Sequence, residues 1–181
     1  MTARVSHLGR LAIFILTFAA SQATPQQSGP IREKVGRFPA ADRPVALIVS
    51  SRWSTEEARD RVDEVGQGIN KSGILPGMTV ADIGAGEGYY TTRLARRVGK
   101  RGHVLAEDID PRVRDALTQR VARERLDNVS VRLGEPANPE LPAARFDRIF
   151  MIHMYHEIQQ PYELLWRIRP SFRPDGEIVV V

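Results

Sequence analysis

A glycine-rich stretch, VADIGAGEGYYTTRLA at residues 80–95, constrains the fold of this chain more than any other segment. Its glycines, Gly84, Gly86 and Gly88, lie between a short apolar run and the start of a helical pattern. A residue without a Cβ lets the chain turn tightly and lets a ligand approach the backbone, while the N–H groups at a helix start supply donors and positive potential. One glycine would satisfy a tight turn, so this spacing predicts a loop that holds a ligand.

Strand and helix patterns alternate from Met78 to the end of the sequence. They predict strands at 79–83, 103–109, 128–134, 146–154 and 177–181, with helices over 89–99, from Pro111, and over 161–169. Parallel neighbours need crossover connections, which are nearly always right-handed helices. The expected fold class is therefore α/β, a doubly wound, mostly parallel Rossmann-like sheet covered on both faces.

The segment before the first strand indicates one amphipathic helix. Ser54 is the expected N-cap, Glu57 completes a capping box, and apolar residues continue at helical spacing to Ile69. We expect a single domain over residues 51–181, preceded by a linker over 24–50 that is rich in Pro, Gly and Gln.

The N-terminus has the layout of a secretory signal peptide over residues 1–23. Arg4 and Arg10 precede the apolar run LAIFILTFAA, and a cut after Ala23 would follow small residues. The run is too short for a permanent membrane span, and the alternative is a buried or interfacial N-terminal helix. Export to the periplasm or cell envelope is the expectation.

Charge and cysteine content exclude several classes of function. The formal net charge is +4, but Arg and Lys alternate with Asp and Glu, as on solvated helix faces, which disfavours nucleic acid as a partner. The chain has no cysteine, which excludes disulfides, thiolate metal sites and a cysteine nucleophile. We expect a small-molecule partner.

The spacing of the loop discriminates between ligands. A dinucleotide loop would place its third glycine at position 89, where Tyr89 stands instead. Asp82 precedes the glycines and suits a ligand with an ammonium group. Asp108 ends the second strand, where a carboxylate can accept hydrogen bonds from ribose hydroxyls, although it could also be an exposed turn residue. Glu107 competes weakly for this role, but its side chain should point to the other face of the strand.

With these residues in place, the chain resembles the class I S-adenosylmethionine-dependent methyltransferases over residues 78–181. The matching pieces are VADIGAGEG, VLAEDIDP, NVSVRLGEPANPELP, FDRIFMIHMYHEI and FRPDGEIVVV, in the order and spacing of the family. The resemblance implies S-adenosylmethionine as cofactor and the strand order 3-2-1-4-5. Because family members continue with another helix and two more strands, we expect the last strand here to be an uncovered apolar edge.

The resemblance also implies which residues hold the cofactor. Asp82 and the backbone of the first two loop glycines would hold the methionine moiety, and Asp108 the ribose. The segment near Glu135 and Asn138 would flank the adenine. The implied set is Asp82, Gly84, Ala85, Gly86, Gly88, Asp108, Ile109, Glu135 and Asn138.

The reaction implied is methyl transfer to an unidentified acceptor, and a general base is needed only if the acceptor atom carries a proton. The candidates for that base are His153, Tyr155 and His156, which could equally pack the end of the fourth strand. No third ligand accompanies the two histidines at a recognisable spacing, so no metal site is predicted.

Two other functions remain open at this point. The first is a non-catalytic exported ligand-binding or interaction module on the same fold. The second, a nicotinamide-dependent oxidoreductase, is disfavoured by Tyr89.

Overall fold

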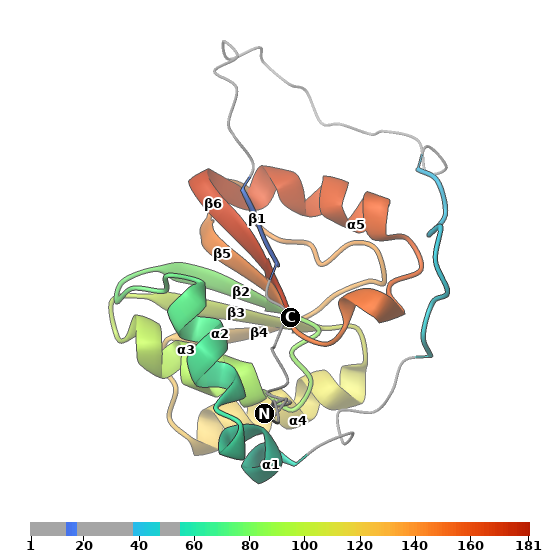
Figure 1. Cartoon of the computed structure of the whole chain (residues 1–181). Helices are drawn as coiled ribbons and strands as arrows, with labels where there is room; N and C mark the ends of the chain where they lie inside the picture. The colour runs from blue at the N-terminus through green and yellow to red at the C-terminus, as the bar shows by residue number, and fades with distance from the viewer. Residues whose placement is uncertain (1–13, 18–37, 48–54) are drawn as a thin grey trace, which may run out of the picture.

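The computed structural model describes residues 14–17, 38–47 and 55–181 (Figure 1). Its centre is a sheet with the strand order β1-β6-β5-β2-β3-β4. Five of these strands are parallel: β2 (Thr79–Ile83), β3 (His103–Asp108), β4 (Val129–Leu133), β5 (Phe146–Met151) and β6 (Phe172–Val180). Numbered among themselves, they have the order 3-2-1-4-5, which confirms the predicted topology.

Helices cover both faces of the sheet. One face carries α1 (Glu56–Arg61), α2 (Glu64–Lys71), α3 (Tyr89–Val98) and α4 (Pro111–Arg123), and the opposite face carries α5 (Pro161–Ile168) (Figure 1). Two short 3₁₀ helices, η1 (Tyr155–Glu157) and η2 (Arg169–Ser171), flank α5 in the sequence.

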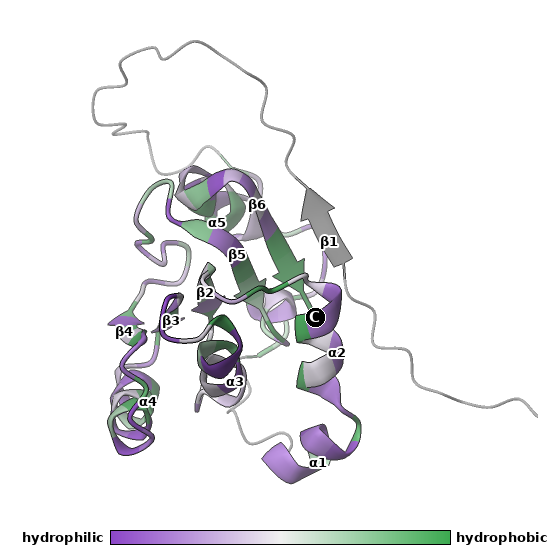
Figure 2. Cartoon of the chain, turned by 90° about the vertical axis from the view of Figure 1, so that its left-hand side faces the viewer, coloured by the Kyte–Doolittle hydropathy of each residue, from purple (hydrophilic) through white to green (hydrophobic). Residues whose placement is uncertain are grey.

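The core consists of two apolar layers, one on each side of the sheet. Figure 2 shows hydrophobic strands between helices whose outer surfaces are hydrophilic. On the α3 side, Tyr90, Leu94 and Val98 are buried together, as the predicted helical spacing required. On the α5 side, Leu164 and Ile168 pack in the second cluster. Each fully buried side chain of this size stabilises the fold by about 1.5–3 kcal/mol.

The prediction of one continuous helix before the first strand is wrong. It divides into α1 and α2 at Asp63, which has the left-handed φ of 50°. Thr55, whose side chain accepts a hydrogen bond from the Ala58 N–H, caps α1, and Ser54 lies outside the described residues. None of the residues of α1 is buried, so burial of apolar side chains does little to hold α1 in line with α2.

Two strand boundaries also differ from the prediction. The strand expected over 146–154 ends at Met151, and His153 has a left-handed φ of 54° that is incompatible with an extended strand. The last strand begins at Phe172 instead of 177 and has a register shift opposite β5. The helix expected from Pro111 is α4, which has Asp110 as its N-cap and Leu117 as its buried residue.

The expected bare edge of β6 is covered, which corrects the prediction. β1 (Phe14–Thr17) pairs with it antiparallel, with Phe14 opposite Val180 and Thr17 opposite Glu177. The other residues of the expected signal peptide, and 24–37 and 48–50 of the expected linker, lie outside the described residues. Among the residues that are described, none forms a helix long and apolar enough to cross a membrane.

Candidate active site

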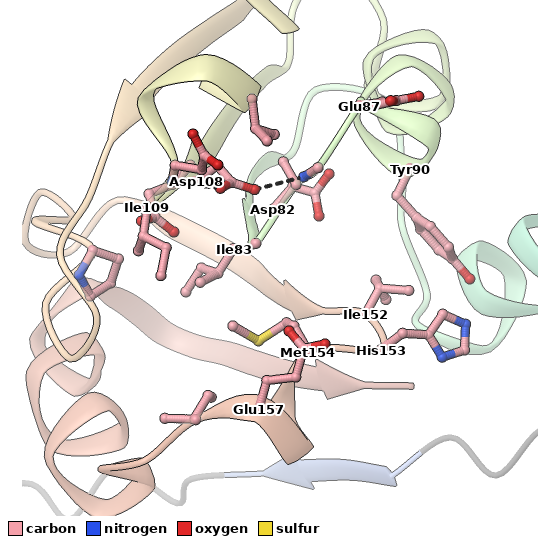
Figure 3. A pocket seen from close by; sticks show the side chains of 18 of the residues that line it. Asp82, Ile83, Glu87, Tyr90, Asp108, Ile109, Ile152, His153, Met154 and Glu157 are labelled. Atoms are coloured by element: carbon pink, nitrogen blue, oxygen red, sulfur yellow. Dashed lines mark hydrogen bonds between the residues drawn. The ribbon is translucent and has the colours of Figure 1, made fainter. Parts of the chain in front are cut away.

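A cleft with a volume of about 1740 Å³ opens at the carboxyl ends of β2, β3 and β5 (Figure 3). Ligands bind at this edge of doubly wound sheets, where the strand order reverses. The cleft is lined mainly by 55–57, 82–87, 107–113, 135–139, 152–154 and 157–160.

The glycine loop forms the floor between β2 and α3. Its three glycines have left-handed φ values, which are 65° at Gly84, 56° at Gly86 and 87° at Gly88. Residues with a Cβ rarely adopt this conformation. A Cβ at Gly84 would lie 3.0 Å from the Cγ of Met154, so the loop and the segment after β5 approach closely. No side chain caps the first turn of α3, so its first backbone N–H groups have no side-chain acceptor.

Asp82 lies beneath this loop at the end of β2. It is 1% exposed, and the hydroxyl of Thr91 donates a 2.6 Å hydrogen bond to its Oδ2. Burial raises the pKa of Asp82 to about 6, although the Thr91 hydrogen bond opposes this. A buried carboxylate is stabilised by a nearby cation, so a ligand ammonium group would fit beside it.

Asp108 lies at the end of β3 and is joined to the glycine loop. Its Oδ2 accepts a 3.0 Å hydrogen bond from the Gly86 N–H, drawn dashed in Figure 3, and its Oδ1 accepts one of 2.9 Å from the Asp110 N–H. These two hydrogen bonds therefore hold the Asp108 carboxylate at the cleft rim, beside the glycine loop.

The segment after β4 forms the far wall. Glu135 and Asn138 exchange backbone hydrogen bonds of 3.0 and 2.9 Å, which close a tight turn lining the cleft. Ile109 is 38% exposed and also lines the cleft, so it offers an apolar surface to a flat ring. The Ala85 N–H donates a 2.9 Å hydrogen bond to the Glu107 carbonyl, which ties the loop to β3.

His153 lies at the opposite side of the cleft from Asp108 (Figure 3). Its Nε2 is 3.1 Å from Oε1 of Glu64, a carboxylate that is 4% exposed and that also accepts a 2.7 Å hydrogen bond from Nη2 of Arg59. Burial opposes ionisation of Glu64, but the hydrogen bonds from His153 and Arg59 outweigh it and lower its pKa to about 2. An ionised carboxylate thus orients the imidazole.

Tyr155 and His156, the other predicted base candidates, do not line the cleft. The Tyr155 ring lies 5.1 Å from the Arg43 guanidinium, and the His156 side chain is 57% exposed. The reason is that β5 ends early and η1 turns both side chains away, while Met154 and Glu157 line the cleft in their place (Figure 3).

The start of α1 is a wall of the cleft that the sequence did not reveal. Thr55, Glu56 and Arg59 line it, and the Arg59 guanidinium lies 3.8 Å from the ring centroid of Tyr89. The sequence signal that could have found this wall is the amphipathic segment directly before β2. Within the described part of the chain, no group of three His, Asp or Glu side chains could hold a metal ion.

Residues 80–176 match the family described as methyltransferase domain. The chain belongs to this family. The Nocamycin O-methyltransferase of Saccharothrix syringae is 36% identical over 104 residues, which cover 57% of this chain and 37% of the relative. The tRNA U34 carboxymethyltransferase of Photorhabdus laumondii is 30% identical over 136 residues, which cover 74% of this chain and 39% of the relative.

A solved structure agrees with the fold of this methyltransferase domain. A SAM-dependent methyltransferase from Aquifex aeolicus has a TM-score of 0.62 at 26% identity, over 70% of this chain and 72% of that one. The present chain spans less than half the length of either curated relative. The names of the two curated relatives specify different acceptors, nocamycin in one and tRNA U34 in the other.

The cleft of this methyltransferase domain fits S-adenosylmethionine, the cofactor of the family. The cofactor is an amino acid joined to a nucleoside, and the cleft has a feature for each part. The loop without a Cβ at Gly84 and the buried carboxylate of Asp82 suit the amino acid, and the fixed carboxylate of Asp108 suits the nucleoside. The apolar surface of Ile109 suits the base.

Proposed function

We propose that this protein transfers a methyl group from S-adenosylmethionine to a small-molecule acceptor. The observation that carries the proposal is the hydrogen bond between Asp108 and Gly86, which makes one ligand-binding edge from two neighbouring strands. A ribose placed on Asp108 puts the rest of the cofactor over the glycine loop, toward Met154 and the end of β5.

The roles of the chain's own residues follow from this orientation. Asp82 and the loop backbone hold the methionine moiety, Asp108 holds the ribose, and Glu135 and Asn138 flank the adenine. When bound, the cofactor supplies an electrophilic methyl group on a sulfonium sulfur. The main task of the protein is then to align the acceptor with that methyl group at near-contact distance and to exclude water.

His153 is the proposed proton acceptor for an acceptor atom that carries a proton. Because Glu64 is ionised, it can only accept, so Nε2 of a neutral His153 carries the proton and Nδ1 is the basic nitrogen. The geometry resembles other histidines that are oriented by a buried carboxylate. Tyr155 and His156 are not proposed for this role, because neither lines the cleft.

The size and charge of the cleft favour a small-molecule acceptor. A volume of about 1740 Å³ exceeds the roughly 300–1,000 Å³ of a typical single-ligand pocket and leaves room for an acceptor beside the cofactor. Arginines that line it, such as Arg120 and Arg167, are paired with the carboxylates of Glu56 and Glu163. They are therefore already neutralised, which supports neither a phosphate backbone nor another polyanion as substrate.

Calorimetric titration with S-adenosylhomocysteine tests the cofactor half of the proposal. We expect binding in the wild type and no binding of NADH. Absence of both heat and thermal shift with S-adenosylhomocysteine would overturn the proposal. Transfer from labelled cofactor to a pool of small-molecule acceptors tests the catalytic half, and binding without transfer to any pool would favour the non-catalytic module.

We also propose that the protein is exported, on the basis of Arg4, Arg10 and the apolar run that follows them. Fractionation of cells that express a C-terminally tagged chain tests this, together with the mass of the purified product. Export predicts a product that begins after Ala23. A product that retains residues 1–23 in the cytoplasmic fraction would contradict it.

A further inference from the structure

Glu107 is a buried acid that none of the roles above uses. It precedes Asp108 in β3, is 1% exposed and lines the cleft, and its side chain was predicted to lie on the other face of the strand from Asp108. Its Oε1 has no hydrogen-bond partner within the described residues. Such unpaired buried polar atoms are rare in proteins, because each has lost its hydrogen bonds to water without gaining a replacement.

The backbone around Glu107 is shaped to admit its carboxyl group. Hydrogen bonding from the Gly84 backbone reaches the carboxyl from the β2 side. On the β4 side lies Gly134, where a Cβ would overlap Oε1. Gly134 leads directly into the 135–139 wall of the cleft. The unpaired oxygen therefore lies beside the residue that precedes the wall flanking the nucleoside in the proposed cofactor orientation.

Glu107 differs from Asp108 in the hydrogen bond that it can offer. Burial, with the negative charges of Asp108 and Asp82, raises the pKa of Glu107 to about 8. At neutral pH the group is mostly protonated and has an O–H to donate. Asp108 accepts hydrogen bonds from two backbone N–H groups, which requires acceptor oxygens. The two neighbouring acids thus supply a donor and an acceptor.

We propose that Glu107 is a further cofactor-binding residue, which donates a hydrogen bond from its carboxyl group to the adenosine half of S-adenosylmethionine. The inference rests on the proposed function, since it requires the nucleoside to lie between the glycine loop and the 135–139 wall. It explains the buried carboxyl, the unpaired Oε1 and the close approach of Gly134 together.

The probe for this contact is 5′-methylthioadenosine, which has the nucleoside but neither the amino acid group nor the sulfonium charge. Calorimetry compares the wild type with Glu107→Gln, which keeps a donor, and Glu107→Met, which keeps the length but has none. We expect Glu107→Gln to stay within about threefold of the wild-type Kd and Glu107→Met to weaken binding about tenfold or more. Equal Kd values for the wild type and Glu107→Met would overturn the inference.

The pH dependence of wild-type binding needs no variant, so it remains informative if a substitution impairs folding. Ionisation of Glu107 removes the donor, and affinity for 5′-methylthioadenosine should therefore fall as pH rises through about 8. Asp82, which also acts on Glu107, titrates near pH 6 and is already ionised in this window. Glu107→Gln should bind with an affinity that does not change between about pH 7 and 9. A flat wild-type profile would contradict the proposal.

Glu163→Gln is the matched control, because Glu163 is also a buried acid of the cleft wall but is paired with Arg167 on α5. Its Kd for 5′-methylthioadenosine should equal that of the wild type. The two proposals fail in different ways. No binding of either 5′-methylthioadenosine or S-adenosylhomocysteine to the wild type would defeat the proposed function, whereas tight binding that is indifferent to Glu107 and to pH would defeat this inference alone.

Discussion

The Oδ2 atom of Asp108 lies 3.0 Å from the backbone nitrogen of Gly86, so the acid that ends β3 and the loop that follows β2 are one hydrogen-bonded unit. The second oxygen of the carboxylate is held by the Asp110 N–H. A group that is fixed in this way loses little conformational entropy when a ligand binds.

Replacing Asp108 by Ala should weaken binding of S-adenosylhomocysteine by about tenfold or more, because both the ribose contact and the support of the loop are lost. Isothermal calorimetry measures the change. Asp115→Ala is the control, since this α4 carboxylate has a 63% exposed side chain and lies outside the cleft lining. An unchanged Kd in Asp108→Ala would contradict the assignment of the ribose site.

Glu64→Gln should lower the free energy of unfolding by about 3–5 kcal/mol, because it leaves Arg59, whose side chain is only 12% exposed, without this ionised partner. Urea denaturation measures the difference. The control is Asp115→Asn, whose 63% exposed carboxylate pairs with Arg114 on the surface of α4, and its cost should be about 0–1 kcal/mol. Equal effects of the two substitutions would show that the Glu64 network contributes no more than a surface pair.

High salt should loosen α1 while leaving α5 unchanged. α1 buries no residue and is attached through charged pairs such as Glu56 and Asp60 with Arg93, at 3.2 and 2.8 Å. The Debye length falls from about 10 Å at 0.1 M salt to about 3 Å at 1 M. Hydrogen exchange of residues 55–63 should therefore accelerate at 1 M salt, and Arg93→Ala should accelerate it already at low salt. Protection that is independent of salt would contradict an electrostatic attachment.

The stability of the ligand-free protein should decrease as pH rises from about 4 to about 8. Burial raises the pKa of Asp82 to about 6 and that of Glu107 to about 8, so the folded state binds protons more tightly than the unfolded chain. The stabilisation is complete below the unfolded pKa values and is lost as pH passes through the folded ones, a change on the order of a few kcal/mol. Urea denaturation across this range measures it. Glu107→Gln should flatten the part of the curve above about pH 7, and an unchanged slope there would contradict the raised pKa.

The export proposed above would remove β1 together with residues 1–23, so the product that begins after Ala23 should expose the edge of β6 and self-associate, because β1 supplies the hydrogen-bonding partner of that edge in the full chain. Light scattering of the full chain and of residues 24–181 measures this. Ile15→Pro tests the same pairing in the full chain, since proline cannot donate to the ladder. A monomeric 24–181 chain with unchanged stability would show that β1 is dispensable.

Local patterns predicted the fold well, because each depends on neighbours in the sequence. The glycine loop after β2 and the alternation of strands and helices determined the sheet order, and that order placed Asp82 and Asp108 at one edge. The break at Asp63 was not predictable in the same way. It accompanies the contact of Glu64 with His153, 89 residues away, and no local spacing records such a contact.

Local sequence patterns also could not predict which base candidates line the cleft or that Glu107 lines it. Which of His153, Tyr155 and His156 lines the cleft depends on where β5 ends, and the left-handed φ of His153 leaves no trace in hydrophobic periodicity. Glu107 was expected to face away because side chains alternate along a strand. Because the cleft lies across the carboxyl ends of the strands, both Glu107 and Asp108 line it, so alternation along β3 does not decide which acid reaches the ligand.

The left-handed glycines of the loop after β2 also limit how this protein could be redesigned. Because Gly84, Gly86 and Gly88 offer only backbone, no substitution there can add a contact, and each would strain the turn. Engineering toward a different methyl acceptor should therefore start from the replaceable side chains at the beginning of α1 and in residues 157–160, with the loop kept as it is.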